Sequence, residues 1–362
     1  LEPGAANQDR PNATTGHATV QPKGACSAQV HLRPTAGPLM RVLVTGGAGY
    51  IGAITVEQLI LAGHEVVVLD TLVTGHREAL APGATLAVHS VSDREAVAEV
   101  LREHGIEAVL HCAARSLVNQ SMQDPALYFT ENVVGGIALL DAMREAGVDR
   151  IVFSCTAAVY GEPDRVPIRE TFPAQPVNPY GASKLAFESA MGWYQAYGLR
   201  SVSLRYFNVA GASEHYGERH DPETHLVPNI LQAARGGPEL TIFGNDYPTA
   251  DGTAIRDSIH VLDLADAHIA ALALTDEREP GQEICNLGSG SGFSVKQVLD
   301  TAVSVVGAEI PHTYGPRRPG DPPALVASND KAEELLGWRP QRGSLREMIG
   351  SAWALEQEDT AD

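Results

Sequence analysis

The sequence predicts an α/β fold with a doubly wound parallel sheet and a smaller C-terminal α/β part. From Met40 to Gly211, short runs rich in β-branched residues alternate with longer helical patterns, which is typical of a parallel sheet with helices on both faces. A glycine-rich turn joins the first of these runs to the first helical pattern. Beyond Gly211 the alternation gives way to polar, Pro-rich and His-rich loops, where we expect a substrate domain.

The alternating elements follow one another in order along the chain. We expect strands over residues 41–45, 64–70, 84–90, 108–114, 150–155 and 201–208. Helices are expected over residues 50–63 and 93–105, from about 124 to 147, and over 183–198.

Composition and charge narrow the classes of partner. The formal net charge of −19 argues against nucleic acid or an anionic membrane as the main partner. No apolar run approaches the roughly 20 residues that span a bilayer. The cysteines, Cys26, Cys112, Cys155 and Cys285, show no C-x-x-C spacing, which favours reduced thiols in a cytoplasmic protein.

The stretch TGGAGYIG, residues 45–52, carries G-x-x-G-x-x-G at Gly46, Gly49 and Gly52. It follows a strand and opens a helix, where glycines let backbone N–H groups approach a pyrophosphate. Asp70 ends the second expected strand, where a carboxylate accepts hydrogen bonds from ribose hydroxyls and repels a 2′-phosphate. The pattern therefore predicts a Rossmann-type sheet that binds NAD rather than NADP.

The stretch YGASK places Tyr180 and Lys184 four residues apart, on one face of a helix. A neighbouring ammonium group favours the phenolate and lowers the pKa of a tyrosine. Thr156, at the end of the preceding strand, offers a hydroxyl group. Together with the NAD motif, this arrangement indicates an enzyme in which Tyr180 acts as a base.

With these motifs, the chain resembles the extended short-chain dehydrogenase/reductase family and, within it, the UDP-glucose (UDP-galactose) 4-epimerases. The resemblance extends from Met40 to about Trp353 and is carried by TGGAGYIG, HCAARSLV, NPYGASK, LRYFNVAGA, FGNDYPTADGTAIRD, NLGSG and PRRPGD. It implies that Tyr180 is the catalytic base, that Lys184 holds the nicotinamide ribose, and that Thr156 contacts the sugar hydroxyl.

The resemblance also implies the remaining binding residues. Cofactor contacts would fall on Gly46, Gly49, Tyr50, Ile51, Gly52, Asp70, Val91, Cys112, Ala113, Ala114 and Asn132, in addition to Tyr180 and Lys184. Contacts to the UDP-sugar would fall on Thr156, Asn208, His225, Leu226, Thr241, Phe243, Arg256, Arg318, Asp321 and Leu325. Guanidinium groups suit a diphosphate, which makes physical sense of Arg256 and Arg318.

The implied domains follow the break near Gly211. We expect an NAD-binding domain over 40–211, to which 255–285 return, and a nucleotide-sugar-binding domain over 212–254 and 286–353. Residues 1–39 are interpreted as a disordered tail, a cloning remnant or an over-extended gene start, and 354–362 as an acidic tail. The resemblance further implies a homodimer.

The implied reaction interconverts UDP-galactose and UDP-glucose through a 4-keto sugar, with NAD retained throughout. Two alternatives remain open: a 4,6-dehydratase or decarboxylase of the same family, and a non-catalytic NAD-binding regulator. Dehydratase-like relatives carry Asp-Glu directly after the threonine, and decarboxylase-like relatives keep a Glu there. This chain has Ala157 and Ala158 instead, which favours the epimerase.

Several positions depart from the family pattern. Ser90, Ser116 and Ser258 stand where relatives often carry Asp, Lys and Tyr, which would weaken contacts to the cofactor and packing around the nucleotide. Leu325 is intermediate in size at a position that limits the sugar pocket in relatives. The sequence therefore leaves open whether N-acetylated UDP-sugars are also substrates.

Three histidines, His215, His220 and His225, recur every five residues. A metal site is one interpretation of this spacing, but paired ligands on one helix favour a spacing of four. We therefore expect no metal ion, and a polar loop in which only His225 contacts the substrate.

Overall fold

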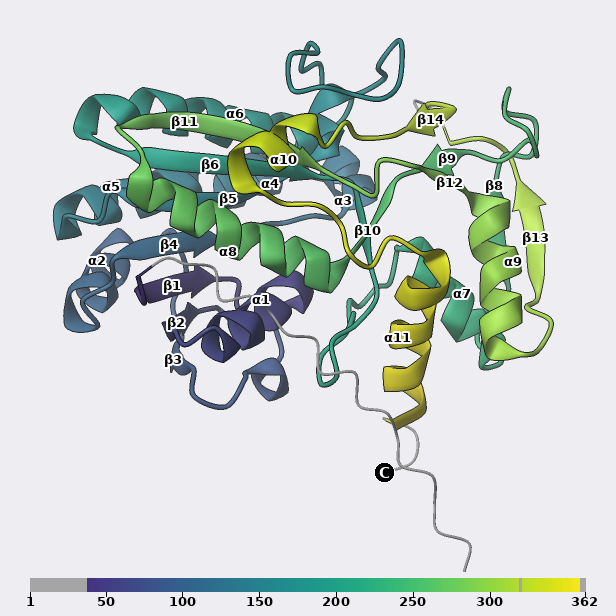
Figure 1. Ribbon diagram of the computed structural model, residues 1–362, viewed down its shortest axis with the longest axis horizontal. Helices are drawn as coiled ribbons and strands as arrows, with labels where there is room; N and C mark the ends of the chain where they lie inside the picture. Colours follow the sequence, from purple (N-terminus) through teal and green to yellow (C-terminus); the bar gives the residue numbers. More distant parts are fainter. Residues whose placement is uncertain (1–37, 319–320, 359–362) are drawn as a thin grey trace, which may run out of the picture. The chain divides into compact units, whose positions relative to one another are not determined.

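Seven parallel strands form the central sheet of the computed structural model, which describes residues 38–318 and 321–358 (Figure 1). Their order across the sheet is β11-β6-β5-β4-β1-β2-β3, and every neighbouring pair is parallel. The strands are β1 (Arg41–Thr45), β2 (Glu65–Leu69), β3 (Thr85–Ala87), β4 (Ala108–His111), β5 (Arg150–Thr156), β6 (Arg200–Tyr206) and β11 (Gly281–Leu287). The predicted doubly wound parallel sheet is confirmed.

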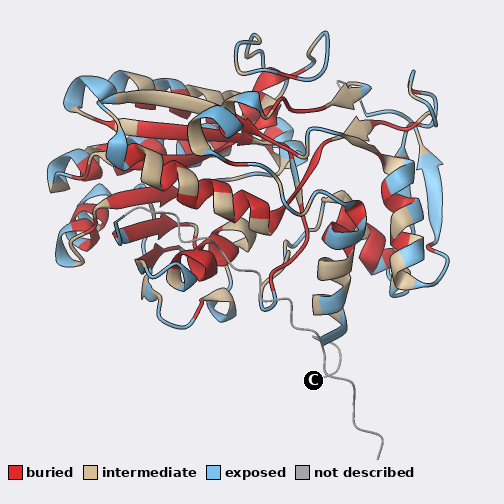
Figure 2. Ribbon diagram, viewed as in Figure 1, coloured by how far each residue is buried: buried red, intermediate tan, exposed pale blue. Residues whose placement is uncertain are grey.

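Helices cover both faces of the sheet, because successive apolar residues of each strand point to opposite sides. In β1, Val42 and Val44 pack on one side, while Leu43 packs on the other. The first side is covered by α1 (Tyr50–Leu61), α8 (Val261–Glu277) and α10 (Asp330–Leu336). The second is covered by α2 (Arg94–Glu103), α5 (Gly135–Ala146) and α6 (Pro179–Tyr194). The central strands are accordingly buried (Figure 2).

The helix expected from about 124 to 147 is interrupted. The chain forms α3 (Val118–Gln123), α4 (Pro125–Tyr128), a π-helical turn (Phe129–Val134) and then α5. A π turn adds one residue to the helical ladder, which a periodicity of apolar residues does not reveal. The expected strands over 84–90 and 108–114 are also shorter, since the chain leaves the sheet after Ala87 and His111.

The C-terminal part is smaller and holds its own apolar cluster. Its helices are α7 (Leu226–Ala234), α9 (Val295–Val306) and α11 (Leu345–Glu358). Its short strands pair as β7 (Asn208–Ala210) with β10 (Ser258–His260), β8 (Leu240–Phe243) with β13 (His312–Gly315), and β9 (Ile255–Arg256) with β12 (Phe293–Ser294) and β14 (Ala324–Leu325).

The expected tails fall partly outside the described residues. Residues 1–37 and 359–362 are not described, so the interpretation of the N-terminal stretch stays a prediction. At the other end, α11 continues to Glu358, so residues 354–358 are helical rather than part of a tail. Within the described ranges, no helix is both long and apolar enough to cross a membrane.

His268 gives the fold a defined sensitivity to acid. It is fully buried on α8, where Nδ1 donates to the Leu264 carbonyl and Nε2 accepts from the Ser154 hydroxyl, both at 2.8 Å. Burial lowers the pKa of His268 to about 4. Between that value and the pKa of about 6.5 in an unfolded chain, the unfolded state binds one more proton.

We therefore expect His268 to lower the free energy of unfolding by about 1.4 kcal/mol per pH unit as the pH falls from 6.5 towards 4. A His268→Gln variant should be less stable at pH 7 but show a shallower decline, because glutamine has no proton to bind. Urea unfolding of both proteins between pH 7 and 5 measures the two slopes. Parallel slopes would contradict this account.

Candidate active site

The glycine-rich turn between β1 and α1 brings backbone into unusually close contact. Gly46 has a φ of +69°, and a Cβ atom on it would lie 2.6 Å from the backbone nitrogen of Ala113. A Cβ atom on Gly52 would lie 2.1 Å from the Gly46 carbonyl oxygen. No side chain caps the N-terminus of α1 at Gly49, and its first turn holds no acidic residue. These N–H groups and the helix dipole fit the pyrophosphate of a dinucleotide.

Asp70 follows β2 and faces this turn. Its carboxylate accepts hydrogen bonds from the backbone N–H groups of Ala48 at 3.0 Å and Leu72 at 2.8 Å. The same side chain thus shapes the turn and places a buried negative charge beside the phosphate site, as expected for a residue that selects NAD.

The other predicted cofactor residues surround the end of β4. Cys112 lies with its sulfur 3.2 Å from the Ser154 hydroxyl, and the backbone N–H of Ala113 donates to the hydroxyl of Thr45 at 3.4 Å. Ala114 follows in the same segment, Val91 packs against the core cluster beneath α5, and Tyr50 and Ile51 begin α1.

Asn132 explains the π-helical turn. Its amide group accepts from the backbone N–H of Arg115 at 2.8 Å and donates to the Arg115 carbonyl and the Ser183 hydroxyl, each at 3.0 Å. The side chain is buried and ties the segment after β4 to α6. The extra residue of the turn directs the Asn132 side chain inward, towards the backbone N–H and carbonyl of Arg115 in the segment after β4.

The predicted catalytic residues meet at the carboxyl end of β5. Thr156 ends the strand, and its hydroxyl accepts from the Ala158 N–H at 3.2 Å and lies beside the Tyr180 phenol, whose pKa burial raises and this hydroxyl lowers. Tyr180 and Lys184 lie in the first two turns of α6, which begins with Asn178 as N-cap and Pro179. Lys184 is buried, with Nζ 4.6 Å from the centroid of the Phe153 ring.

The expected lowering of the Tyr180 pKa is wrong for the chain by itself. Burial is the largest influence and raises the pKa of Tyr180 well above its ordinary value, although the Thr156 hydrogen bond acts in the opposite direction. Burial also lowers the pKa of Lys184 to about 8. The sequence reveals the spacing of the two groups but not the loss of water around them.

A buried network behind these residues was not predicted from the sequence. Arg205 on β6 forms an ion pair with Glu188 on α6, and the pair is almost completely enclosed. Arg205 also donates to the Tyr160 hydroxyl at 2.9 Å, and Tyr160 donates to Asn286 on β11 at 2.8 Å. Arg205 lies in the motif LRYFN, but nothing in the sequence identifies its partner.

The predicted substrate residues of the C-terminal part form two groups. Arg256 makes an ion pair with Asp321, and Leu325 stands opposite Arg256 in the β9–β14 pair. The Arg318 guanidinium lies 4.1 Å from the centroid of the Phe243 ring. In the described ranges, neither group shares a hydrogen bond or ion pair with Thr156, Tyr180 or Lys184.

The remaining substrate candidates lie on nearby elements. Thr241 is in β8 beside Phe243, and Asn208 begins β7, where its N–H donates to the Asp257 carbonyl at 3.0 Å. His225 is the N-cap of α7, and Leu226 is the first residue of that helix.

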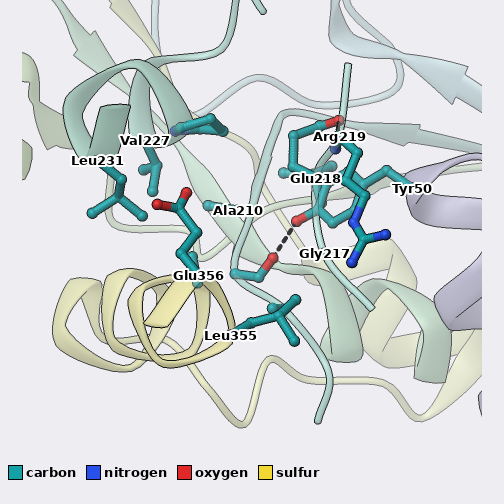
Figure 3. A pocket seen from close by; sticks show the side chains of 14 residues that line it. Tyr50, Ala210, Gly217, Glu218, Arg219, Val227, Leu231, Leu355 and Glu356 are labelled. Atoms are coloured by element: carbon teal, nitrogen blue, oxygen red, sulfur yellow. Dashed lines mark hydrogen bonds between the residues drawn. The ribbon is translucent and has the colours of Figure 1, made fainter. Parts of the chain in front are cut away.

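Two small cavities lie on either side of Tyr50. One is lined by the glycine-rich turn together with Thr74, His76 and residues of the loop 216–220. The other lies between that loop, α7 and α11, and there the Tyr50 hydroxyl donates to the Gly211 carbonyl at 2.6 Å (Figure 3). Thr156, Tyr180 and Lys184 line neither cavity, so these cavities are separate from the predicted catalytic residues.

Comparison with known proteins adds independent findings. Residues 42–288 match the NAD dependent epimerase/dehydratase family. A UDP-glucose 4-epimerase from Lacticaseibacillus casei is 52% identical over 318 residues, covering 87% of this chain and 96% of that enzyme.

Solved structures of UDP-glucose 4-epimerases are also similar to this chain. The UDP-glucose 4-epimerase from Brucella ovis in complex with NAD superposes with a TM-score of 0.85 at 41% identity, covering 87% of this chain and 98% of that one. The enzyme from Bifidobacterium longum in complex with NAD⁺ and UDP gives a TM-score of 0.83 at 34% identity, covering 88% and 99%.

A Gly52→Ala variant tests the glycine-rich turn. The added methyl group would collide with the Gly46 carbonyl, so the turn must open and the N–H groups of α1 must move. We expect at least about a tenfold loss of NAD affinity, which corresponds to 1.4 kcal/mol or more. NAD released from the denatured protein measures the bound fraction.

Gly343→Ala is the matched control, since a Cβ atom there has no neighbour within 4 Å. Full NAD content in the Gly52 variant would mean that close approach at the turn does not matter for the cofactor.

Proposed function

The chain belongs to the NAD dependent epimerase/dehydratase family, and from this premise we propose that it interconverts UDP-galactose and UDP-glucose at C4, with NAD as a tightly bound cofactor. The observation that carries the proposal is the end of β5. Thr156 ends the strand there with its hydroxyl beside the Tyr180 phenol, whose pKa it lowers against the larger effect of burial, and the next two residues are Ala157 and Ala158.

The lack of an acid or base after Thr156 distinguishes this reaction from its alternatives. A 4,6-dehydratase or a decarboxylase needs a further carboxyl group beside the keto sugar. Ala157 is buried in the apolar cluster, and a Cβ atom on Gly181 would lie 2.5 Å from the Ala158 carbonyl oxygen. A carboxylate at 157 would replace a side chain buried in this apolar cluster, and burying a charge there is costly. An oxidised sugar in this site therefore meets no group that commits it to elimination.

The chain's own residues supply acid–base chemistry and positioning. Tyr180 would take the proton from the C4 hydroxyl and later return it, while the Thr156 hydroxyl hydrogen-bonds the sugar. Lys184 would hold the nicotinamide ribose. Bound NAD supplies the hydride acceptor and donor and, in its oxidised form, a positive charge. Because burial raises the pKa of Tyr180, the free chain keeps this phenol protonated.

The binding residues are assigned on the same premise. We assign the cofactor to the glycine-rich turn, Asp70, Val91, the segment 112–114 and Asn132. We assign the nucleotide sugar to Asn208, His225, Leu226, Thr241, Phe243, Arg256, Arg318, Asp321 and Leu325. The division into an NAD-binding domain and a nucleotide-sugar-binding domain belongs to this proposal. A reducing compartment such as the cytoplasm suits Cys112, Cys155 and Cys285, which are free thiols.

A Tyr180→Phe variant tests the catalytic assignment. Removing the hydroxyl leaves the ring packing beside Tyr128 in place but removes the proton acceptor, so we expect kcat to fall by about 10²- to 10⁴-fold. The assay follows conversion of UDP-galactose to UDP-glucose without added reductant. Tyr197→Phe, on an exposed ring, is the control and should keep full activity.

Full activity in the Tyr180 variant would refute the base assignment. Accumulation of a 4-keto-6-deoxy sugar by the unaltered enzyme would instead identify a dehydratase. Testing UDP-N-acetylgalactosamine in the same assay shows how far the pocket beside Leu325 opens.

We also propose that the protein is a homodimer whose interface is formed by α5, α6 and the π-helical turn. Large apolar side chains are exposed along these elements and on the neighbouring α3: Met122, Phe129, Val134, Ile137 and Trp193. Trp193 is 80% exposed and Val134 61% exposed. Exposed apolar side chains grouped on neighbouring elements are typical of a protein–protein contact.

A Val134→Glu substitution should split the dimer, because it places a charge in the centre of an apolar contact. Light scattering coupled to size-exclusion chromatography measures the mass. Leu61→Glu, at the equally exposed end of α1, is the control and should leave the mass unchanged. A wild-type protein of monomeric mass at micromolar concentration would end this proposal.

A further inference from the structure

The loop between β7 and α7 gathers four side chains that could bind a metal ion. Glu218, His220, Glu223 and His225 each offer one donor atom, and these atoms all lie within 4.8 Å of one another. His215 belongs to the same histidine repeat but stands apart, because its Nδ1 atom pairs with Glu57 on α1 at 2.7 Å. Two of the three histidines therefore converge with two glutamates that the spacing alone did not point to.

The two carboxylates in this cluster are buried. The side chains of Glu218 and Glu223 are 9% and 6% exposed, and the side chains that pair with them are the two imidazoles. Burying two carboxylates is expensive unless positive charge compensates them. Against the effect of burial, Glu223 and Glu218 raise the pKa of His225, so a protonated His225 offers one positive charge, whereas a divalent cation would neutralise both carboxylates.

One ring nitrogen of the cluster lacks a hydrogen bond. His220 Nδ1 is shielded from solvent and makes an ion-pair contact with the Glu218 carboxylate, while the His220 side chain as a whole is 31% exposed. A ring nitrogen of His220 therefore lies among the donor atoms of three other side chains, all within 4.8 Å of one another, which is the spacing of a metal-ligand set. Imidazole nitrogen is among the commonest ligands of divalent transition metals.

The cluster lies beside the glycine-rich turn, so the charge of its carboxylates affects the anion site at the start of α1. Glu218 and His220 line the cavity that also contains Ala48, Gly49 and Tyr50 of the glycine-rich turn. Besides burial, the charges of Glu218 and Glu223 raise the pKa of the Tyr50 phenol. Two uncompensated carboxylates would thus weaken the anion site at the start of α1, and a bound cation would remove that repulsion.

We propose that Glu218, His220, Glu223 and His225 bind one divalent transition-metal ion, with Zn²⁺ as the best fit, and that the ion fastens the 211–225 loop beside the glycine-rich turn. Two imidazole nitrogens and two carboxylate oxygens make a four-ligand set without an open position, which is the pattern of a structural zinc site. Its role is therefore to hold the loop, and the proposal does not depend on which reaction the enzyme catalyses. One nitrogen of His225 is used, so its other ring nitrogen can still face a substrate.

The test uses the full-length protein without an affinity tag, stripped with EDTA and dialysed. Titration with Co²⁺ should give visible absorption bands of a four-coordinate site that saturate at one equivalent, and Zn²⁺ should displace them. Elemental analysis after Zn²⁺ loading and gel filtration should find one zinc per chain. Zn²⁺ at 100 times its dissociation constant should raise the melting temperature by several degrees.

Two variants assign the site. His220→Ala and Glu223→Gln should each weaken Zn²⁺ binding by about tenfold or more, the effect that even outer-shell changes produce at metal sites. His215→Ala is the matched control, since it lies in the same loop outside the cluster, and it should bind Zn²⁺ like the wild type. The wild-type Co²⁺ spectrum decides the question even where a variant fails to fold.

Zinc well below one equivalent in the wild type would overturn the proposal, and the cluster would then be a network of protonated histidines paired with glutamates. Equal loss of binding in the His215 and His220 variants would overturn it as well, because the metal would then lie elsewhere.

Discussion

The buried ion pair between Arg205 and Glu188 holds the catalytic end of the sheet together. Arg205 comes from β6, Glu188 from α6, and Tyr160 and Asn286 extend the pair to the turn after β5 and to β11. Removing one partner of such a pair typically costs about 3–5 kcal/mol, because the other charge stays buried. The pair therefore fixes α6, which carries Tyr180 and Lys184, against β6, and Tyr160 links it to the turn that follows Thr156. The groups proposed for proton transfer are thus held by a buried network that is separate from the proposed substrate contacts.

The sequence was sufficient to predict those elements whose structure depends only on neighbouring residues. The glycine-rich turn, β1 and the start of α1 follow directly from TGGAGYIG, because only glycines fit the contacts at Gly46 and Gly52. Arrangements that depend on distant partners could not be predicted. The π-helical turn exists because Asn132 reaches Arg115 and Ser183, and a period of 3.6 residues contains no sign of that. Similarly, Tyr180 and Lys184 were found by their spacing, but their pKa values follow from burial that only the folded chain reveals.

The histidine repeat also shows that sequence spacing does not predict which side chains meet in a folded loop. A spacing of five residues is unfavourable for two ligands on one helix, but these residues lie in a loop, where the chain path decides which side chains meet. His215 turns towards Glu57, whereas His220 and His225 turn towards each other, with ring centroids 5.4 Å apart. Glutamates two residues before each of them, Glu218 and Glu223, complete the group. In a loop, the residue types are informative and their regular spacing is not.

The nucleotide end and the sugar end of the candidate substrate site differ in how many side-chain groups are available to bind a ligand. In the proposed assignment, the nucleotide would meet charge and an aromatic face at Arg256, Arg318, Asp321 and Phe243, and Arg256 and Arg318 are already held by Asp321 and Phe243. Such preorganisation reduces the entropy lost on binding a diphosphate. For the sugar, Thr156 and Tyr180 provide hydroxyl groups, and Ala157 and Ala158 provide none. Binding energy concentrated on the nucleotide leaves the sugar free to turn over, which a reaction that returns hydride to the opposite face requires. An acid or base placed beside Thr156 would hold the sugar in one orientation and oppose that turn.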